Sequence, residues 1–341
     1  MIAAVLIAAF VPDAGAVFPG ANGKIVVATA LTHPVSGDDD VGGHAVWLAA
    51  RGRPAVRLFR GAKPSFSPRG NRLVYQEPFG YSIEVSRADG SHRRVLAEER
   101  SGTRLQSPAW SPLGDGLAFF RDGEGLFVMR ASGGNERLVL PSRAYEGEAA
   151  WSPAGTELAL AGSRGLIHAV GLDGSLPRRI ARGWFPSWVT DRQLVFQRRR
   201  SLYLAATTGA GGEDLLVDRL QVLDPFLVRS HAPEYSLSPR RKRIAFARRG
   251  RIHVVRISGG AAPAITPPGR TGACCPLFSP DGRLVAFVRG HAIFVIPARG
   301  GTERLFARLP RAPGCSGLSV PRECYWWVAG LDWQARPRTR D

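Results

Sequence analysis

Lysine is scarce in this 341-residue chain: Lys24, Lys63 and Lys242 are the only lysines among 46 basic residues. The formal net charge of +18 is therefore carried almost wholly by arginine. An anionic partner, such as nucleic acid, a lipid head group or a wall polymer, would explain this charge. A general preference for arginine over lysine explains it more simply, and diffuse charge of that kind indicates solubility rather than one specific partner.

Long hydrophobic runs are also missing. No stretch reaches the roughly 18 apolar residues that a transmembrane helix needs, so we expect no membrane span. A short apolar run follows Met1, and Ala14-Gly15-Ala16 fits the small-x-small pattern of a signal-peptide cleavage site, although this start lacks the usual basic residue. We predict a signal peptide at 1–16 and an extracytoplasmic mature chain that is periplasmic, cell-wall associated or secreted. A buried apolar first strand is the alternative.

Cysteine is limited to Cys274, Cys275, Cys315 and Cys324. An even number of cysteines in an exported chain predicts disulfides. Cys315–Cys324 is the candidate, because it closes a loop of modest length whereas a bond between the adjacent Cys274 and Cys275 would be strained. Pairing between the two clusters stays open. A zinc site is disfavoured, because no C-x-x-C spacing occurs and no histidine lies beside Cys315 or Cys324. We predict no cofactor.

The dominant feature of the sequence is a repeat that recurs about every 40 residues. Each copy has a strand that ends in a large residue, a Ser-Pro-x-Gly turn, and a strand of the Leu-Ala-Phe type. The proline presets φ at the second position of the turn, and the glycine supplies a positive φ. The residues that anchor the first strand are Phe66, Trp110, Trp151, Trp188, Leu237, Phe278 and Trp333.

Two further strands complete each copy, with a glycine-rich turn between them, and four antiparallel strands per copy are typical of a β-propeller blade. We therefore predict an all-β propeller of seven four-stranded blades, with six as the alternative. The seven second strands contain Ile25, Leu73, Leu117, Leu158, Leu194, Ile244 and Leu284. The first unit lacks a first strand and the strand of Trp333 has no successor, so the C-terminal strand should pair into the N-terminal blade and close the ring.

The segment Phe278-Ser-Pro-Asp-Gly-Arg-Leu-Val-Ala-Phe287 resembles the TolB-like (PD40, WD40-like) β-propeller repeat, and Phe18–Ile25 is similar to the start of such proteins. The resemblance covers roughly 18–335, so we predict a TolB-like propeller domain at 17–336 and a short tail at 337–341. It implies the propeller fold. Its functional implication is broad, because the repeat occurs in TolB, in propellers of prolyl-oligopeptidase-type peptidases and in lyases. TolB carries an extra N-terminal α/β domain for which these residues leave no room, so a literal TolB role is not expected.

Few residues predict catalysis. No Gly-x-Ser-x-Gly nucleophile elbow occurs, which argues against a propeller peptidase. His168 and His253 occupy the repeat position that aromatic residues hold in other copies, and we interpret them as packing between blades. His44, His231 and the acidic segment 38–40 fall in long loops, where function tends to lie. The alternative function is thus a propeller enzyme, a hydrolase or lyase that acts on a saccharide or peptide in the central funnel.

In a propeller, the turn between the second and third strands lies on the same face as the links between blades, and this face usually binds partners. Arginine recurs in these turns, and the loop 308–328 adds an aromatic rim. The candidate binding face comprises Arg121, Arg164, Arg198, Arg199, Arg200, Arg248, Arg249, Arg251, Arg289, Trp326 and Trp327. The opposite face carries the Ser-Pro-x-Gly turns and is interpreted as structural.

Together these features predict an exported, non-enzymatic and monomeric scaffold or binding protein. Its expected partner is an envelope protein or an anionic polymer, which the arginine-rich face would contact. Nucleic acid is disfavoured as a partner, because export would separate the chain from it.

Overall fold

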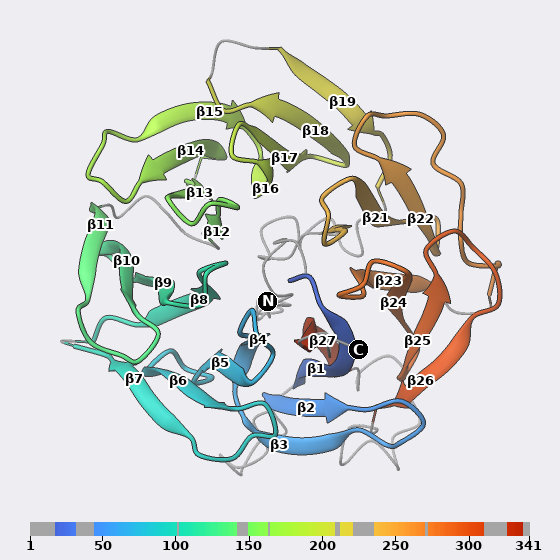
Figure 1. Ribbon diagram of the computed structural model, residues 1–341, viewed down its shortest axis with the longest axis horizontal. Coiled ribbons are helices and arrows are strands. Elements are labelled where there is room, and N and C mark those ends of the chain that lie inside the picture. Colours follow the sequence, from blue (N-terminus) through green and yellow to red (C-terminus); the bar gives the residue numbers. More distant parts are fainter. Residues whose placement is uncertain are drawn as a thin grey trace, which may run out of the picture.

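The computed structural model describes residues 18–31, 44–100, 102–141, 149–162, 164–208, 212–220, 235–269, 272–309 and 326–336. Their strands form seven antiparallel sheets arranged in a ring (Figure 1). The chain is therefore a seven-bladed β-propeller, which confirms the predicted fold and the count of seven over six. No α-helix occurs within these ranges, so they contain no helix that could cross a membrane.

Blade 1 joins the two ends of the chain. From the axis outward it contains β27 (Trp326–Arg336), β1 (Ala21–Leu31), β2 (Ala45–Ala49) and β3 (Val56–Arg60). Trp333 lies opposite Ile25 in the pairing of β27 with β1, so the predicted ring closure is confirmed. The strand begins at Trp326, inside the loop predicted to reach residue 328, because β1 extends to Leu31 and supplies pairing partners.

Five further blades have four strands each, in chain order from the axis outward (Figure 1). Blade 2 contains β4 (Ala62–Phe66), β5 (Arg72–Gln76), β6 (Ser82–Arg87) and β7 (Arg94–Glu98). Blade 3 contains β8 (Leu105–Trp110), β9 (Gly116–Arg121), β10 (Gly125–Arg130) and β11 (Arg137–Pro141). Blade 4 contains β12 (Ala150–Trp151), β13 (Glu157–Ala161), β14 (Leu166–Gly171) and β15 (Arg178–Arg182). Blade 5 contains β16 (Trp184–Thr190), β17 (Gln193–Arg198), β18 (Ser201–Ala206) and β19 (Glu213–Val217). Blade 7 contains β23 (Ala273–Phe278), β24 (Leu284–Arg289), β25 (Ala292–Pro297) and β26 (Arg304–Arg308).

Blade 6 departs from the prediction of four strands. Its sheet contains β20 (Tyr235–Leu237), β21 (Arg243–Arg248) and β22 (Arg251–Arg256). The place of a fourth strand is taken by a segment that makes one isolated bridge, between His253 and Ala264. Pro263 precedes the bridge and Pro267 follows it, and because proline has no N–H to donate, a regular ladder cannot form there.

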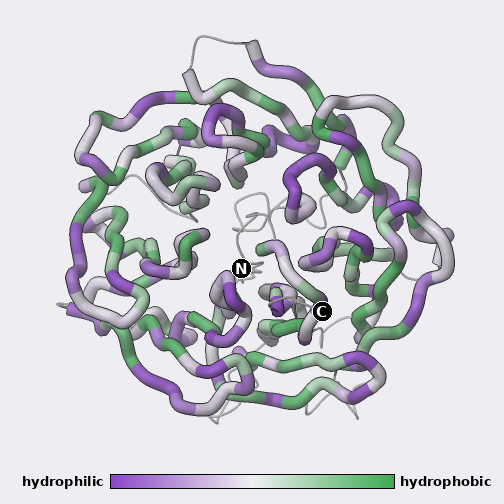
Figure 2. Tube along the Cα trace, viewed as in Figure 1, coloured by the Kyte–Doolittle hydropathy of each residue, from purple (hydrophilic) through white to green (hydrophobic). Residues whose placement is uncertain are grey.

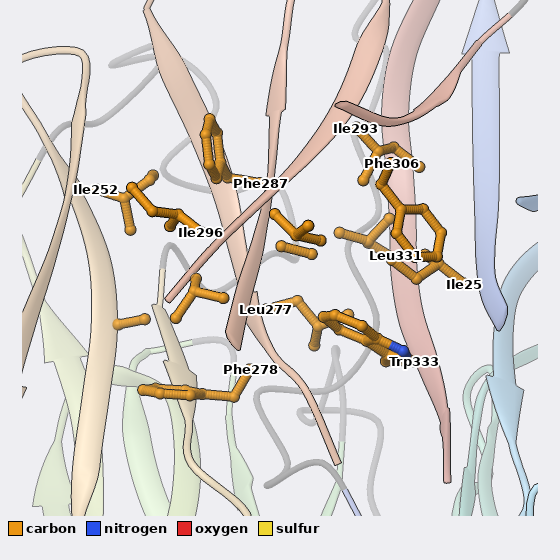
Figure 3. Packing of buried hydrophobic residues seen from close by; sticks show 14 of the residues in the cluster. Ile25, Ile252, Leu277, Phe278, Phe287, Ile293, Ile296, Phe306, Leu331 and Trp333 are labelled. Carbon is orange, nitrogen blue, oxygen red and sulfur yellow. The ribbon is translucent and has the colours of Figure 1, made fainter. Parts of the chain in front are cut away.

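The blades pack face to face, and the second strands are buried on both sides. In β9 the run Leu117–Phe120 is at most 4% exposed, as expected for a strand covered by a sheet on either face. Figure 2 shows hydrophobic segments through the inner strands and hydrophilic ones at many turns. Figure 3 shows the side chains that meet where blades 6, 7 and 1 adjoin, among them Ile252, Phe287 and Trp333.

Three of the first-strand anchors, all tryptophans, tie their blades to the one before. The indole Nε1 of Trp110 donates a hydrogen bond to the Ser65 carbonyl (3.2 Å), and that of Trp151 to the Ala109 carbonyl (3.1 Å). Trp188 makes the same bond to blade 4 (2.8 Å). A buried indole needs such a partner, so each bond fixes the spacing of neighbouring blades. The anchors are all at most 9% exposed: Phe66, Trp110, Trp151, Trp188, Leu237, Phe278 and Trp333.

Candidate functional site

The hairpin face, defined by the turns between second and third strands and by the links between blades, carries the predicted arginines. Three of them, each the last residue of a second strand, are ion-paired with a glutamate that starts the fourth strand of the same blade or precedes it by one residue. The pairs are Arg121–Glu136 (2.8 Å), Arg198–Glu213 (2.7 Å) and Arg289–Glu303 (2.6 Å). The Arg121 side chain is only 2% exposed. Each of these guanidinium groups is therefore held against its own blade.

The same arginines cover stacked rings on the second and third strands. The guanidinium of Arg121 lies 5.7 Å from the ring centre of Phe119 and 5.6 Å from that of Phe127, within cation–π range. Corresponding ring pairs are Phe196–Tyr203, Phe287–Phe294 and Phe246–His253, covered by Arg198, Arg289 and Arg248. This arrangement stabilises the blade and leaves these four arginines less able to reach a partner.

The two predicted packing histidines lie on third strands. His253 stacks on Phe246 with ring centres 5.4 Å apart, and its Nδ1 lies 2.9 Å from the Ala262 carbonyl. His168 is opposite Leu160 in β14. Burial lowers the pKa of both imidazoles, because it penalises the charged form. The stack of His253 on Phe246 lies within blade 6, so packing of these two histidines between blades stays a prediction.

Two further face arginines hold the links between blades. Arg200 Nε donates to the Leu220 carbonyl (3.1 Å), and Arg251 Nε donates to the Thr266 carbonyl (2.8 Å). Arg164, in contrast, is exposed at the hairpin of blade 4. Some arginines of the predicted binding face thus stabilise the propeller, and others are exposed to solvent.

A hollow of about 790 Å³ opens on the hairpin face between blades 5 and 6. Its charged lining is Arg199, Arg200, Arg219, Arg249 and Asp218. The Asp218 carboxylate accepts a hydrogen bond from Ser201 (2.8 Å) and lies 3.6 Å from the Arg219 guanidinium, and these contacts lower its pKa, the hydrogen bond first. Four arginines thus face one carboxylate, so the hollow, named here the hairpin hollow, attracts anions.

Three arginines of the hairpin hollow have a left-handed backbone. φ is +54° at Arg199, +58° at Arg219 and +51° at Arg249, whereas other hairpins place glycine in this region, as at Gly123. A left-handed residue with a Cβ costs roughly 1–2 kcal/mol, and such strain tends to persist at functional positions. The left-handed backbone sets the direction of the Cα–Cβ bond at these three arginines.

Several predicted features fall outside the described residues. They are the signal peptide 1–16, the acidic segment 38–40, His231, the pair Cys315 and Cys324, and the tail 337–341. For Trp326 and Trp327 only the backbone, as part of β27, is described.

Three further residues with candidate chemistry are described. Burial first, and then the nearby charge of Arg60, lower the pKa of His44. Cys274 and Cys275 are partly buried, with Sγ atoms 2.7 Å apart.

Two features of the hairpin face escaped the sequence analysis. Phe79 and Tyr81, on the hairpin of blade 2, are 53% and 52% exposed with ring centres 5.9 Å apart. The signal was present, since Pro-Phe-Gly-Tyr stands there in place of arginine. A bulge also begins four first strands: Lys63, Ser107, Phe185 and Cys275 precede proline with positive φ, and Lys63 Nζ lies 2.5 Å from Ser107 Oγ.

The described ranges hold no group of three or more His, Cys, Asp or Glu side chains that could bind a metal ion. The charged groups of the hairpin hollow are four arginines and one aspartate. Its chemistry is that of a guanidinium site, which suits carboxylates and phosphates.

No protein-family model matches the sequence, and no curated protein matches it. Solved structures do match. TolB from Acinetobacter baumannii is 15% identical, with 92% of this chain and 67% of that chain covered and a TM-score of 0.50. An oligogalacturonate lyase in complex with manganese is 13% identical, with 88% and 89% covered and a TM-score of 0.58. The C-terminal WD40 domain of Sif2 is 14% identical, with 73% and 86% covered and a TM-score of 0.52. The chain is thus a propeller similar to TolB-like and WD40-like propellers, as its repeat predicted, and the likeness shows the fold alone.

Proposed function

We propose that this chain is an exported, non-enzymatic scaffold that binds an acidic segment of another envelope protein through the hairpin hollow. The observation that carries the proposal is the group of Arg199, Arg200, Arg219 and Arg249 around one carboxylate, Asp218. Guanidinium groups bind carboxylates with paired, charge-assisted hydrogen bonds. A peptide rich in aspartate and glutamate therefore complements this surface.

The fold supports a scaffold. A closed ring of seven sheets is rigid, and it presents hairpins and links from neighbouring blades on one face. The exposed pair Phe79 and Tyr81 adds aromatic area of the kind that dominates protein interfaces. The proposed export depends on Ala14-Gly15-Ala16, a sequence pattern only.

An enzyme is the competing proposal. One solved neighbour is an oligogalacturonate lyase, a likeness of fold at 13% identity. Purified protein incubated with oligogalacturonate should leave it intact. Formation of an unsaturated product would replace the scaffold proposal with a lyase.

The scaffold is tested by capture from envelope extract with a variant that carries Arg199→Asn, Arg219→Asn and Arg249→Asn. Asparagine removes the charge yet tolerates a left-handed backbone, so the fold should be kept. We expect the variant to lose a specific acidic protein that the parent captures. An acidic peptide from that protein should then bind the variant at least about tenfold more weakly, as expected for three lost charge-assisted contacts.

The control removes the same amount of charge from the opposite face, with Arg240→Gln, Arg283→Gln and Arg299→Gln. All three side chains are exposed. If both variants lose the partner equally, the net charge is responsible and the hairpin hollow is not the site. Full capture by the first variant would also refute the proposal.

A further inference from the structure

A second hollow, of about 1210 Å³, opens on the face that carries the Ser-Pro-x-Gly turns. It lies among the turns of blades 2, 6 and 7 and the start and end of blade 1, and is named here the turn-face hollow. Figure 2 shows hydrophilic turns near the axis in blades 6 and 7. From the sequence, this face is expected to be structural, because the Ser-Pro-x-Gly pattern is explained by the backbone needs of the turns.

The turn-face hollow is strongly basic. Its cations are Arg69, Arg240, Lys242, Arg243, Arg283, Arg299 and Arg336. Asp281 is the one carboxylate in its lining, and it is held within its own turn, where Ser279 Oγ donates to it at 2.6 Å and the Arg283 N–H at 2.9 Å. Seven cations therefore share this lining with a single carboxylate.

None of these seven cations forms an ion pair with a carboxylate in the described part of the chain, where the pairs involve other arginines. Arg243 donates to the Gly282 carbonyl (2.7 Å) and lies 5.4 Å from the Phe278 ring centre. Burial and then the charge of Arg299 lower the pKa of Arg243. Like charges gathered in this way repel one another, and a bound anion relieves that repulsion.

The walls indicate the kind of anion. The remaining side chains of the lining are mainly proline and alanine: Pro19, Pro68, Pro239, Pro280, Pro297 and Ala298. No aromatic ring is present in this lining, so the platform on which proteins stack nucleic-acid bases is missing. Dense positive charge without a stacking surface suits a ligand that carries a charge on every unit of its chain and no bulky ring.

We propose that the turn-face hollow binds a linear phosphate chain, either inorganic polyphosphate or a phosphodiester polymer. Guanidinium groups bind phosphate oxygens in a forked geometry, and Lys242 adds a point charge. This inference does not depend on the acidic-protein partner proposed for the hairpin hollow, because the two sites lie on opposite faces and share no residue.

The test measures binding of short linear inorganic polyphosphate by titration calorimetry to the full chain and to both charge-matched variants. Arg240→Gln, Arg283→Gln and Arg299→Gln should weaken binding by at least about tenfold, since three charge-assisted contacts are lost. These three side chains are exposed in the part of the chain that the structure describes, so thermal unfolding should match the parent. The hairpin-hollow variant should bind within about twofold of the parent.

Three results would overturn the inference. Equal weakening in both variants would reduce it to net charge, and unchanged binding in the turn-face variant would place the anion elsewhere. Oligogalacturonate that binds as tightly as polyphosphate, with the same loss of binding in the turn-face variant, would show a general polyanion site with no selectivity for phosphate.

Binding of a synthetic polyol-phosphate oligomer, compared with binding of polyphosphate, identifies which phosphate source fits the turn-face hollow better. Loss of polyphosphate binding with partner capture unchanged would separate this site from the scaffold proposal.

Discussion

Gly70 and Gly114 hold the same position of the Ser-Pro-x-Gly turn in blades 2 and 3, with φ of +67° and +74°. Their surroundings differ. A Cβ on Gly70 would lie 1.9 Å from the Ala335 carbonyl oxygen of the closing strand, whereas the nearest atom to a Cβ on Gly114 is Pro68 Cδ at 3.6 Å. The same turn residue thus has only a backbone role in blade 3 and also permits ring closure in blade 2.

We expect Gly114→Ala to lower the free energy of unfolding by roughly 1–2 kcal/mol, the cost of a left-handed alanine. Gly70→Ala should lower it by roughly 1–3 kcal/mol more, because backbone atoms must move to relieve the overlap. Urea unfolding of both variants against the parent measures the difference. Equal losses would mean that the contact between this turn and the closing strand is not tight in solution.

At the scale of the element, several blades share one arrangement, in which an arginine guanidinium covers two stacked rings from the second and third strands. Blade 6 uses Phe246 and His253 under Arg248, where blade 7 uses Phe287 and Phe294 under Arg289. The imidazole makes this blade sensitive to acid. Burial lowers the pKa of folded His253 below the ordinary value of 6.5, so the unfolded chain takes up the proton first as the pH falls.

His253→Phe should therefore remove part of the loss of stability between about pH 7.5 and about pH 5. The parent loses stability as the pH falls through the unfolded value, and phenylalanine does not titrate. Urea midpoints at the two pH values give the comparison. A substitution of the exposed His291 to serine is the control, and a parent-like loss in the His253→Phe variant would contradict the assignment.

At the scale of the whole molecule, the ring is held at its closure by a partly buried carboxylate. Asp332 in β27 accepts hydrogen bonds from the Phe66 N–H (2.7 Å) and Ser65 Oγ (3.2 Å) of blade 2, and from the Trp333 N–H (2.8 Å). Burial outweighs these donors and raises the pKa of Asp332 from 3.8 to about 6. The folded ring therefore favours the protonated acid.

A raised carboxyl pKa contributes stability below about pH 4, and that contribution is lost as the pH rises through about 6. Two pKa units correspond to about 3 kcal/mol at most. Asp332→Asn stays neutral, so the variant should gain on the parent by up to this amount between about pH 4 and about pH 7.5. Chemical unfolding across this range tests it, and a difference that is constant with pH would show that Asp332 has an ordinary pKa.

Charge is also organised at this scale. Arg121, Arg198 and Arg289 are neutralised within their own blades, whereas most arginines of the two hollows are exposed to solvent. Some of the arginines behind the net charge of +18 thus stabilise the blades, and others form the charged surface. Composition counts both kinds alike, which is why it could not distinguish a partner from a general preference for arginine.

The repeat determined the architecture, because turn chemistry and strand alternation act over a few residues and can be read locally. The anchor residues, the seven second strands and the closure at Trp333 are of this kind. Blade 6 escaped the prediction where Pro263 and Pro267 interrupt its outer edge.

The sites were decided by the tertiary structure. Arg240, Arg283 and Arg299 belong to different turns and meet only because the ring brings blades 6 and 7 together at one face. Arg121 looked like a binding residue in its hairpin, yet the fold turns it onto Phe119 and Glu136. Side-chain direction and long-range proximity arise from packing between blades, and a pattern along one chain does not contain them.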